Sequence, residues 1–372
     1  MPGMIAIDPD TRALLDRFGF DEARLAAHAA ALAAGGPPPD NAVAGAVTSA
    51  DDAVVALPPP GSAARAALAA RGAEAIRAGQ VGVVYLAGGM ATRFGGVVKA
   101  VVPVVGDRTF LDLKLADAAR VAADHHTRVP VWLLTSYATH ARLEDELAAR
   151  PPAPSTPVAC VPQFVSLRLA PDGALFREAD GALSPYAPGH GDLSFALRRA
   201  GVLERFRAAG GRYLHMSNVD NLAATLDPAV IGAHLASGCG LTAEVVAKDP
   251  GDKGGAPARV DGVAQILEAF RFPRGFDQDA IRVFNTNSFV LDVDAIDRDF
   301  PLTYFHVAKQ VDGATAIQYE RLVGELTAFV PTHFLEVPRR GVDGRFQPVK
   351  DPPELEARRA DIEAILRARG VL

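Results

Sequence analysis

The sequence predicts an α/β protein with a mostly parallel mixed sheet flanked by helices, a helical N-terminal lobe before it and a small C-terminal lobe after it. From residue 81 onward, short apolar runs alternate with helical stretches, which is the pattern of a parallel sheet covered on both faces. The first 80 residues instead hold alanine-rich helical stretches separated by proline breaks. With 372 residues, 49% of them hydrophobic and 22% charged, the chain can bury a full core, which excludes a disordered, collagen-like or coiled-coil protein.

Residues 1–80 form the predicted helical lobe. Helices are expected over residues 21–34 and 62–77, where leucine and arginine are spaced along alanine-rich stretches. The Gly-Gly-Pro-Pro-Pro run at 35–39 and the Pro-Pro-Pro-Gly run at 58–61 interrupt any helix. The lobe carries no obvious chemistry.

Residues 81–300 form the predicted central domain. In a parallel sheet, ligands bind beyond the carboxyl ends of the strands, so the residues that follow each strand are the candidates for a site. The expected strands are 81–87, 129–135, 158–164, 212–216 and 241–247, and the expected helices are 112–123, 140–150, 193–209 and 228–237.

Residues 301–372 form the predicted C-terminal lobe, in which the alternation of strands and helices weakens. A helical segment is expected around residues 316–326, followed by a short strand at 334–337. A final amphipathic helix is expected over residues 353–369.

Charge and cysteine content exclude several classes of protein. The net charge is −6, from 38 Lys+Arg against 44 Asp+Glu, so no global positive field attracts nucleic acid. No apolar run reaches the ~18 residues of a membrane span, and the N-terminus lacks a basic-then-apolar export signal. Cys160 and Cys239 have neither a C-x-x-C nor a zinc spacing. We therefore expect a cytoplasmic protein without disulfides, nucleic-acid partners or membrane partners.

A glycine-rich loop follows the first predicted strand, at residues 86–96, and Lys99 comes soon after it. Glycines let backbone N–H groups close on an anion, while Thr92, Arg93 and Lys99 add donors and positive charge. The pattern indicates a phosphate-binding loop, and its alternative is an ordinary strand-to-helix turn. Both G-x-G-x-x-G and G-x-x-x-x-G-K-[ST] are absent, so a nicotinamide-dependent oxidoreductase fits least well.

Asn218 and Asp220 directly follow the apolar run at 213–216, which places them at the carboxyl end of a strand. A lone carboxylate beside triphosphate oxygens suits Mg²⁺, which keeps waters and takes one or two protein ligands. The alternative is a polar pair that caps the next helix. We expect a magnesium ligand because a phosphate-binding loop lies upstream.

Other polar residues are candidates for ligand contacts. The Gly-His-Gly run at 189–191 would bring backbone close to a flat ligand, although its histidine could equally be structural. Asn285 and Asn287 occupy alternate positions of an expected strand, so their amides share one face and suit sugar hydroxyls; the alternative is a polar edge strand. Lys248 and Lys253 bracket a turn and have the pattern of solvated loop lysines.

Several of these motifs together resemble one family. The loop from Leu86 to Lys99, with the Pro-Val that follows at 103–104, resembles the signature loop of sugar-1-phosphate nucleotidylyltransferases, in particular the eukaryotic-type UDP-sugar pyrophosphorylase (UTP–glucose-1-phosphate uridylyltransferase) family. Further motifs follow in the family's order across about residues 80–355. They are P-G-H-G-D at 188–192, S-N-x-D-N-L at 217–222, F-N-T-N at 284–287, K-x-x-D-G…Q-x-E at 309–320, and V-P-R…R-F-x-P-V-K at 337–350.

The resemblance implies a Rossmann-like nucleotide-diphospho-sugar transferase fold, with residues 81–300 as the nucleotide- and sugar-binding catalytic domain and residues 301–372 completing the site. It implies that UTP and a sugar 1-phosphate, most simply glucose 1-phosphate, give UDP-sugar and pyrophosphate. The sugar phosphate is already an anionic nucleophile, so the attack on the α-phosphate needs alignment and charge neutralisation by Mg²⁺ and cationic side chains rather than a general base.

The resemblance also assigns roles to individual residues. Arg93 and Lys99 would stabilise the reacting phosphate, Lys309 would hold the attacking phosphate, and Asp220 would hold Mg²⁺. Gln163 matches a glutamine that reads the uracil edge, and an amide offers both a donor and an acceptor for it. Glu320 would orient Lys309 or another polar group at the sugar site, and Lys248 is a weak candidate. The other expected nucleotide-binding residues are Leu86, Ala87, Gly88, Gly89, Thr92, Gly189 and Asn218, and the other expected sugar-binding residues are His190, Asn285 and Asn287.

Three departures from the family pattern qualify these expectations. Ala91 replaces the second glycine of the G-x-G-T turn, where a Cβ would interfere with close approach of the nucleotide or demand a different turn. Val98 stands where the family has proline, and the stretch 95–99 is one residue short, which affects the register of Lys99. Only a short helix follows Lys350, where family members commonly continue into a left-handed β-helix, so we expect a monomer or a weak dimer.

Two other functions remain open. The family branch that acts on N-acetylhexosamine 1-phosphates usually carries a G-N-G-G-like segment where this chain has P-G-H-G-D at 188–192, which favours the glucose or broad UDP-sugar branch. A nucleotide-sugar binding protein without turnover is suggested by Ala91 and Val98. Asp220, Lys99 and Lys309 are retained, which argues for an enzyme.

Overall fold

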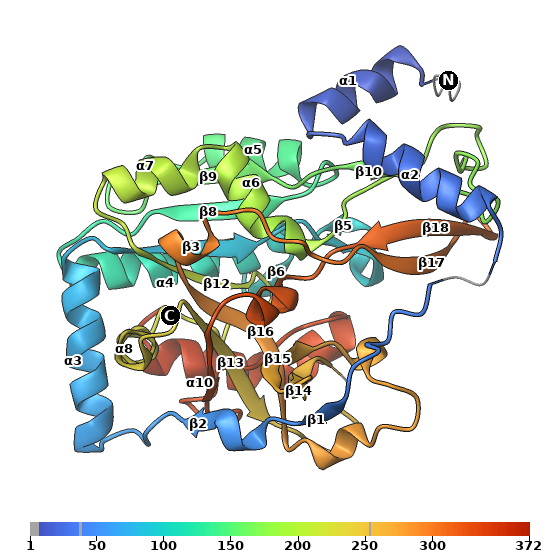
Figure 1. Ribbon diagram of the computed structural model, residues 1–372. Coiled ribbons are helices and arrows are strands. Elements are labelled where there is room, and N and C mark those ends of the chain that lie inside the picture. The colour runs from blue at the N-terminus through green and yellow to red at the C-terminus, as the bar shows by residue number, and fades with distance from the viewer. Residues whose placement is uncertain (1–6, 37–38, 253) are drawn as a thin grey trace.

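An eight-stranded mixed sheet forms the centre of the computed structural model, which describes residues 7–36, 39–252 and 254–372 (Figure 1). All neighbouring strands are parallel except β16, which runs antiparallel to both β12 and β13. The predicted mostly parallel mixed sheet is therefore confirmed. The strand order is β2 (Val54–Ala56), β19 (Thr332–Glu336), β13 (Leu241–Ala247), β16 (Val283–Asp292), β12 (Tyr213–Asn218), β3 (Val81–Leu86), β8 (Val131–Thr135) and β9 (Val158–Pro162).

Helices cover both faces of this sheet, because its central strands are apolar on both sides. Val83 and Tyr85 of β3 belong to one hydrophobic core and the intervening Val84 belongs to the other. The first core is closed by α4 (Phe110–Asp124), α5 (His140–Ala148), α8 (Pro228–Ser237) and α10 (Pro352–Ala368). The second is closed by α6 (Leu193–Arg199), α7 (Val202–Ala208), α9 (Val293–Ile296) and the 3₁₀ turn η7 (Val323–Ala328).

The N-terminal segment contributes helices at two separate places. Helices α1 (Pro9–Arg17) and α2 (Glu22–Ala33) share a third apolar core with residues 165–183 and β18 (Ala314–Glu320). Helix α3 (Ala63–Arg77) lies along α8, and Gly72 and Gly232 let the two backbones touch, since a Cβ on either would lie 1.8 Å from a carbonyl oxygen of the other helix.

The same segment also forms strands that the sequence analysis did not predict. Strand β1 (Val47–Ser49) pairs with β14 (Ala256–Val260), which pairs in turn with β15 (Val263–Leu267), and β2 lies at the edge of the central sheet. Residues 1–6 of the predicted lobe, Pro37 and Pro38 of the predicted break, and Lys253 lie outside the described residues. The division of the chain into three lobes stays a prediction.

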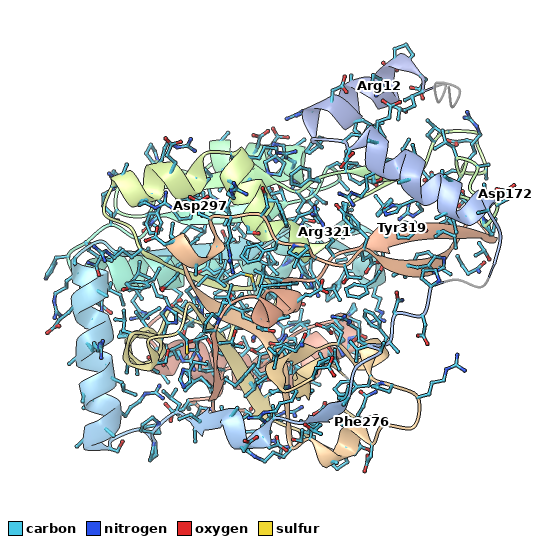
Figure 2. The ribbon with its side chains drawn as sticks, viewed as in Figure 1. Arg12, Asp172, Phe276, Asp297, Tyr319 and Arg321 are labelled. Carbon is cyan, nitrogen blue, oxygen red and sulfur yellow. The ribbon has the colours of Figure 1, made fainter. Side chains whose placement is uncertain are left out.

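Two of the predicted helices are corrected by the structure. The segment 316–326 is not a helix: β18 pairs with β17 (Phe305–Val311) in a hairpin, and η7 follows. The strand forms because Ile317 and Tyr319 pack on the N-terminal helices, and Figure 2 shows Tyr319 on β18 beneath α2. The helix expected over 193–209 is divided into α6 and α7 at Gly201, whose φ of 65° breaks the helical path.

Three short two-stranded antiparallel pairs follow the strands of the central sheet in the chain. They are β4 (Met90–Ala91) with β5 (Val97–Val98), β6 (Pro103–Val105) with β7 (Arg108–Thr109), and β10 (Ser166–Leu167) with β11 (Pro185–Tyr186). The first of these is the glycine-rich loop. Among the helices of the described residues, none has the length and apolarity required to cross a membrane.

Candidate functional site at the carboxyl edge of the sheet

The candidate site lies where β3, β12, β8 and β9 end. These four strands are parallel and their carboxyl ends meet at one edge of the sheet, so the loops that follow them are neighbours. The loop after β3 carries Gly88, the loop after β12 carries Asp220, the residue after β8 is Ser136, and Gln163 follows β9.

Gly88 packs closely against the ends of β8 and β9. A Cβ on Gly88 would lie 2.8 Å from Gln163 Nε2 and 3.2 Å from the backbone nitrogen of Ser136. Ser136 Oγ donates a hydrogen bond of 2.8 Å to the carbonyl oxygen of Gly88, which fixes the loop against β8. Gln163 is buried at 5% exposure beside this contact, so its amide borders the glycine-rich loop.

The two departures in the loop are accommodated by its local structure. Ala91 has a φ of −83° and is buried in the β4–β5 hairpin, so the backbone there does not demand glycine. Val98 is also buried, and its side chain joins the first hydrophobic core. Gly89 faces open space, and its carbonyl oxygen accepts a 3.1 Å hydrogen bond from the backbone N–H of Lys99.

Lys99 and Asp220 meet directly. The ammonium of Lys99 forms an ion pair with Oδ2 of Asp220, and their side chains are 18% and 13% exposed. The shortened stretch before Lys99 therefore still delivers its charge to the loop after β12. This contact brings together a predicted phosphate-binding cation and the predicted magnesium ligand.

Arg93 and Thr92 lie apart from this pair. They are exposed on a 3₁₀ turn (Thr92–Phe94), and Arg93 Nη1 is 4.0 Å from Asp351 Oδ2 at the start of α10. Within the described part of the chain, no hydrogen bond or ion pair links either residue to Lys99 or Asp220. The Arg93 side chain is 64% exposed, so it has room to turn.

The P-G-H-G-D loop is held tightly against the residues that follow β18. Gly189 has a φ of 105°, and a Cβ on it would lie 2.8 Å from the carbonyl oxygen of Arg321, while one on Gly191 would lie 2.5 Å from the Arg321 carbonyl carbon. Both glycines are therefore required by close backbone approach. Asp192 is fully buried, accepts a hydrogen bond from the N–H of Phe164 and pairs with Arg321. Its role is to fix the loop.

His190 is both anchored and available to a ligand. Its Nδ1 accepts a 3.0 Å hydrogen bond from the backbone N–H of Val323, so the neutral ring carries its proton on Nε2. Burial lowers the pKa of His190 to about 4, although Glu320 opposes this shift. The half-buried ring therefore stays neutral near pH 7 and can offer one N–H donor.

Lys309 is carried by the β17–β18 hairpin. Its Nζ lies 3.4 Å from Glu320 Oε1, and the two side chains are 46% and 27% exposed. The residue after Glu320 is Arg321, whose backbone N–H bonds to the Pro188 carbonyl oxygen, so the end of this hairpin borders the P-G-H-G-D loop. The structure thus pairs Lys309 with Glu320 on a hairpin whose end lies beside the loop that carries His190.

The two asparagines of the F-N-T-N motif lie in strand β16 as expected, and both are half-buried with the buried Thr286 between them. The strand is irregular here, because a β-bulge lies in the β13–β16 pairing and Asn287 has a φ of 58°. That the two side chains share one face stays a prediction. Asn287 Nδ2 donates a 2.9 Å hydrogen bond to Asn218 Oδ1, and Asn285 Oδ1 accepts one from the N–H of Asn287.

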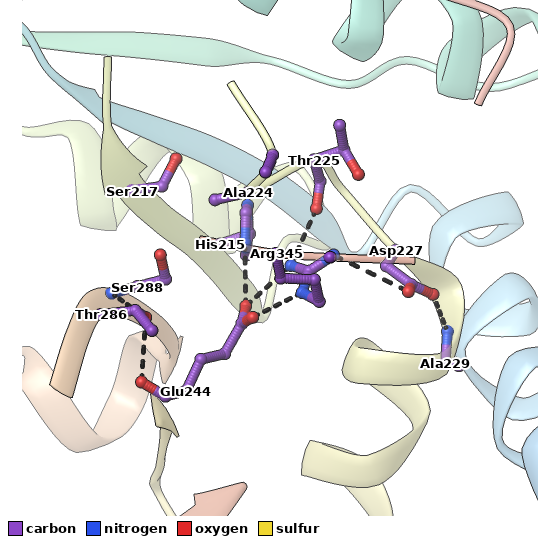
Figure 3. Close-up of polar contacts among 12 residues, drawn as sticks. His215, Ser217, Ala224, Thr225, Asp227, Ala229, Glu244, Thr286, Ser288 and Arg345 are labelled. Atoms are coloured by element: carbon purple, nitrogen blue, oxygen red, sulfur yellow. Dashed lines mark hydrogen bonds and ion pairs between the residues drawn. The ribbon is translucent and has the colours of Figure 1, made fainter. Parts of the chain in front are cut away.

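A buried charged network that the sequence analysis missed supports the loop after β12 (Figure 3). Arg345 donates hydrogen bonds of 2.5 and 2.8 Å to Glu244 and one of 3.0 Å to the Thr225 carbonyl oxygen, and both charged side chains are almost fully buried. The carbonyl oxygen of Arg345 accepts a hydrogen bond from Asn221 Nδ2. Burial raises the pKa of Glu244, but Arg345 and His215 outweigh it and hold that pKa well below its ordinary value.

Helix α4 holds the same loop from the other side. The ammonium of Lys114 is buried and donates hydrogen bonds of 3.0 Å to Ser217 Oγ and 2.8 Å to the Ala224 carbonyl oxygen, which bridges the two ends of the loop. Burial lowers the pKa of Lys114 to about 7. Asp117 Oδ2 accepts a further bond from the N–H of Leu226. The only sign of this contact in the sequence is that Lys114 stands between the apolar residues Leu113 and Leu115 of α4.

The remaining lysines of the family motifs have other partners. Lys248 Nζ donates a hydrogen bond to the carbonyl oxygen of Gln278, and Lys350 is exposed. Among residues 7–36, 39–252 and 254–372, no group of three or more His, Cys, Asp or Glu side chains is arranged to hold a metal ion. Asp220 is thus a single carboxylate, and it is paired with the Lys99 ammonium.

Comparison with known proteins gives a consistent match. The sequence profile of UTP–glucose-1-phosphate uridylyltransferase matches residues 52–362. UTP–glucose-1-phosphate uridylyltransferase 2 of Dictyostelium discoideum is 29% identical over 296 residues, which covers 75% of this chain and 58% of that protein. The enzyme of Encephalitozoon cuniculi is 26% identical over 289 residues, covering 74% and 57%. The chain therefore spans less than three fifths of the length of these two relatives.

Solved structures share the fold. A UDP-glucose pyrophosphorylase variant from Leishmania major superposes with a TM-score of 0.70 at 23% identity, over 95% of this chain and 79% of that one. The UDP-N-acetylglucosamine pyrophosphorylase of Trypanosoma brucei superposes with a TM-score of 0.73 at 18% identity, over 97% and 80%. At these identities the likeness establishes the fold, which is that of the UDP-sugar pyrophosphorylases.

Proposed function

Because this chain belongs to the UTP–glucose-1-phosphate uridylyltransferase family, we propose that it transfers a uridylyl group from UTP to a sugar 1-phosphate, with glucose 1-phosphate as the preferred sugar, and releases pyrophosphate. The observation that carries the proposal is the Lys99–Asp220 pair at the carboxyl edge of the sheet. It pairs a cation suited to phosphate with a carboxylate suited to a metal, and the backbone N–H of Lys99 bonds to the Gly89 carbonyl oxygen of the glycine-rich loop.

The chemistry requires alignment and charge neutralisation. An oxygen of the sugar phosphate attacks the α-phosphorus of UTP, the bond to the β-phosphate oxygen breaks, and pyrophosphate leaves with that electron pair. Lys99 would place positive charge at the reacting phosphate and Lys309 at the attacking phosphate. Arg93, 64% exposed, would turn from Asp351 toward the leaving group when UTP binds. The attacking oxygen is already ionised near pH 7, so no side chain needs to remove a proton.

The site at Asp220 fits a divalent cation whose ligands come partly from the protein and partly from the substrate. A single carboxylate is enough for Mg²⁺ when phosphate oxygens and waters complete the shell. Bound Mg²⁺ would neutralise charge on the α-phosphate and the leaving pyrophosphate. Lys99 would then move its ammonium from the carboxylate to a phosphate oxygen, and Asn287 would hold Asn218 in place beside the metal ligand.

Recognition of base and sugar would come from polar groups around these charges. The buried amide of Gln163 would pair with the uracil edge, and the tight contact of Gly88 with β8 and β9 would leave the base a narrow slot. His190 Nε2–H and the amide of Asn285 would bind the ribose or sugar hydroxyls. Glu320 would act on the sugar site through Lys309, with which it pairs.

The decisive experiment is pyrophosphate release from UTP and Mg²⁺ with glucose 1-phosphate, galactose 1-phosphate and N-acetylglucosamine 1-phosphate assayed side by side. We expect the highest kcat/KM with glucose 1-phosphate. A preference for the N-acetylated sugar would identify the other family branch instead. If UTP binds but no pyrophosphate is released in the presence of any of the three sugar phosphates, the chain is a binding protein without turnover and the proposal is overturned.

Variants of the central pair test the assignment of roles. Lys99→Ala and Asp220→Asn should each lower kcat by about 10²-fold, because each removes a group that acts on the charge of the transition state. Asp145→Asn, an exposed carboxylate on α5, is the matched control and should leave kcat unchanged. Losses below about tenfold for both site variants would show that this pair does not carry the reaction.

A further inference from the structure

A line of polar side chains joins the segment 166–186 to the hairpin that carries Lys309. Arg168 Nε donates a 2.9 Å hydrogen bond to Gln318 Oε1, and Gln318 Nε2 donates one of 2.6 Å to Glu320 Oε1. Glu320 Oε1 in turn lies 3.4 Å from Lys309 Nζ. These four residues are called the Arg168 relay below. Figure 1 shows β10, next to Arg168, above the β17–β18 hairpin, and Leu169 bridges to Ile317 between them.

We propose that Arg168 is a positioning residue for Lys309 and acts through Gln318 and Glu320. The proposal rests on the proposed function for its effect on catalysis, since Lys309 is there assigned to hold the attacking phosphate. It assigns a role to a residue that lies outside every motif of the sequence analysis.

The chemistry of the relay allows only one arrangement. Arginine has donors and no acceptor, and an ionised carboxylate has acceptors and no donor. The amide of Gln318 must therefore turn its oxygen to Arg168 and its nitrogen to Glu320. Gln318 is 6% exposed, so water does not compete for these bonds. The direction of the Glu320 carboxylate is thus set by Arg168.

Arg168 is itself held firmly. Its Nη1 donates hydrogen bonds to Ser184 Oγ at 2.9 Å and to the Pro185 carbonyl oxygen at 3.1 Å, and its guanidinium lies 5.7 Å from the centre of the Tyr186 ring. Its backbone N–H also bonds to the Ser184 carbonyl oxygen. The relay therefore starts at Arg168, which is fixed by several contacts, and ends at Lys309, whose side chain is half-exposed.

Lys309 needs such support because its pair with Glu320 is partly exposed. Exposed ion pairs hold long side chains weakly, since water screens the charges and each side chain has many rotamers. A Glu320 carboxylate fixed by Gln318 gives Lys309 one preferred direction. The end of the hairpin borders the P-G-H-G-D loop, because the Arg321 N–H bonds to the Pro188 carbonyl oxygen and the Gly191 N–H to that of Arg321.

The kinetic test compares Arg168→Met, which keeps the apolar stem, with Gln318→Leu, which keeps the size of the amide. The control is Arg177→Met on the same segment, whose guanidinium bonds to the Gly181 carbonyl oxygen and to no other group among the residues that the structure describes. Both relay variants should lower kcat/KM for glucose 1-phosphate about tenfold, with the KM for UTP unchanged, because only the attacking phosphate is misplaced. An equal rise in both KM values would indicate a general loss of structure and overturn the proposal.

A double-mutant cycle isolates the route through Lys309. In a Lys309→Met background, Arg168→Met should change kcat/KM by less than about twofold, because the group it positions is gone. Multiplicative losses would show that Arg168 acts by another path. If Arg168→Met does not fold, Gln318→Leu gives the same cycle without touching the anchor at Ser184.

A second measurement does not depend on turnover. Acylation of lysines by acetic anhydride, followed by mass spectrometry, reports how freely the Lys309 amine reacts, with exposed Lys350 as the internal reference. The relay variants should raise the relative rate at Lys309 about threefold, because an amine no longer held against the Glu320 carboxylate is more accessible to the reagent. An unchanged rate would overturn the relay even in an active enzyme. Inactivity of the unmodified protein, with the rate raised as expected, would refute the proposed function alone.

Discussion

Replacing Arg345 with methionine should destabilise the protein strongly, and more strongly at pH 8 than at pH 5. The guanidinium gives Glu244 two hydrogen bonds, at 2.5 and 2.8 Å, and Thr225 one at 3.0 Å. Glu244 is fully buried, so Arg345→Met leaves a carboxylate that water cannot reach. Removal of one partner of a buried pair costs about 3–5 kcal/mol, a large part of the ~5–15 kcal/mol by which such proteins are stable.

The pH dependence follows from the pKa of Glu244. In the intact protein, burial raises this pKa but Arg345 outweighs it, so the folded value lies below the unfolded value of 4.5. The pair's contribution is therefore complete above pH 4.5 and is lost as the pH falls further. In Arg345→Met burial dominates, so the pKa of Glu244 in the folded variant lies above 4.5. The loss of unfolding free energy relative to the intact protein therefore grows as the pH rises. Other charged or titratable groups near Glu244 include His215, whose Nε2 lies 3.5 Å from Glu244 Oε1, together with Lys114 and Arg369.

Urea unfolding followed by the fluorescence of Trp132, the single tryptophan, measures the effect at both pH values. Glu244→Gln/Arg345→Met should recover part of the loss, since no buried charge is left unpaired. A deficit below about 1 kcal/mol at pH 8 would refute the reasoning, because it would mean that Glu244 is not held by Arg345. The reasoning would also be refuted if Arg345→Met lost the same unfolding free energy at pH 5 and pH 8, or if the double variant were no more stable than Arg345→Met.

Three further changes have definite expected outcomes. Gly232→Ala should cost about 3 kcal/mol in unfolding free energy, measured by urea titration, because its Cβ would lie 1.8 Å from a carbonyl oxygen of α3; a loss under about 1 kcal/mol would contradict the close helix contact. Gly88→Ala should raise the KM for UTP about tenfold while the melting temperature changes little, because the Cβ would push the neighbouring glutamine amide out of place; an unchanged KM would remove this glycine from the nucleotide site. His190→Gln should reduce the loss of unfolding free energy between pH 6.5 and pH 4. Burial lowers the pKa of His190 in the folded state to about 4, so the unfolded state takes up a proton first as the pH falls. Urea titrations over this pH range would contradict the prediction if the curves of the two proteins were parallel.

The central strands and the position of the site could be predicted from the sequence because one physical rule governs both. Strands β3 and β12 are largely buried on both faces, so residues 81–86 and 213–216 are mostly apolar runs, in the second of which His215 is the polar member. Parallel strands end at one edge of the sheet, so the residues that follow them are the candidates for a site, and two of these candidates, Lys99 and Asp220, form an ion pair. The roles of these residues in catalysis stay predictions.

What the sequence could not predict depends on contacts between distant segments. The stretch A-T-A-I-Q-Y-E at 314–320 contains helix-favouring alanine, glutamine and glutamate, and only its pairing with β17 and its packing on α2 make it a strand. From the sequence alone, Lys114 is expected to be a solvated lysine of a helix. Its burial depends on the distant loop after β12, which supplies its two hydrogen-bond acceptors. Asn287 departs from the strand pattern because β13 and β16 are joined through a bulge.

The pairing of β2 with β19 has a consequence for the order in which the protein can be built. Residues 54–56 leave the ribosome about 280 residues before their partners at 334–336, which at ~5–20 residues per second is a wait of roughly 15–60 s. During synthesis the sheet can form from β3 onward, but β2 has no partner until residues 332–336 have emerged. Val55 is 53% exposed even in the finished sheet, and β2 is only three residues long, which limits its ability to recruit other strands meanwhile. A strand this short offers few unpaired backbone groups to another chain while it waits for its partner, and it still forms the edge of the native sheet.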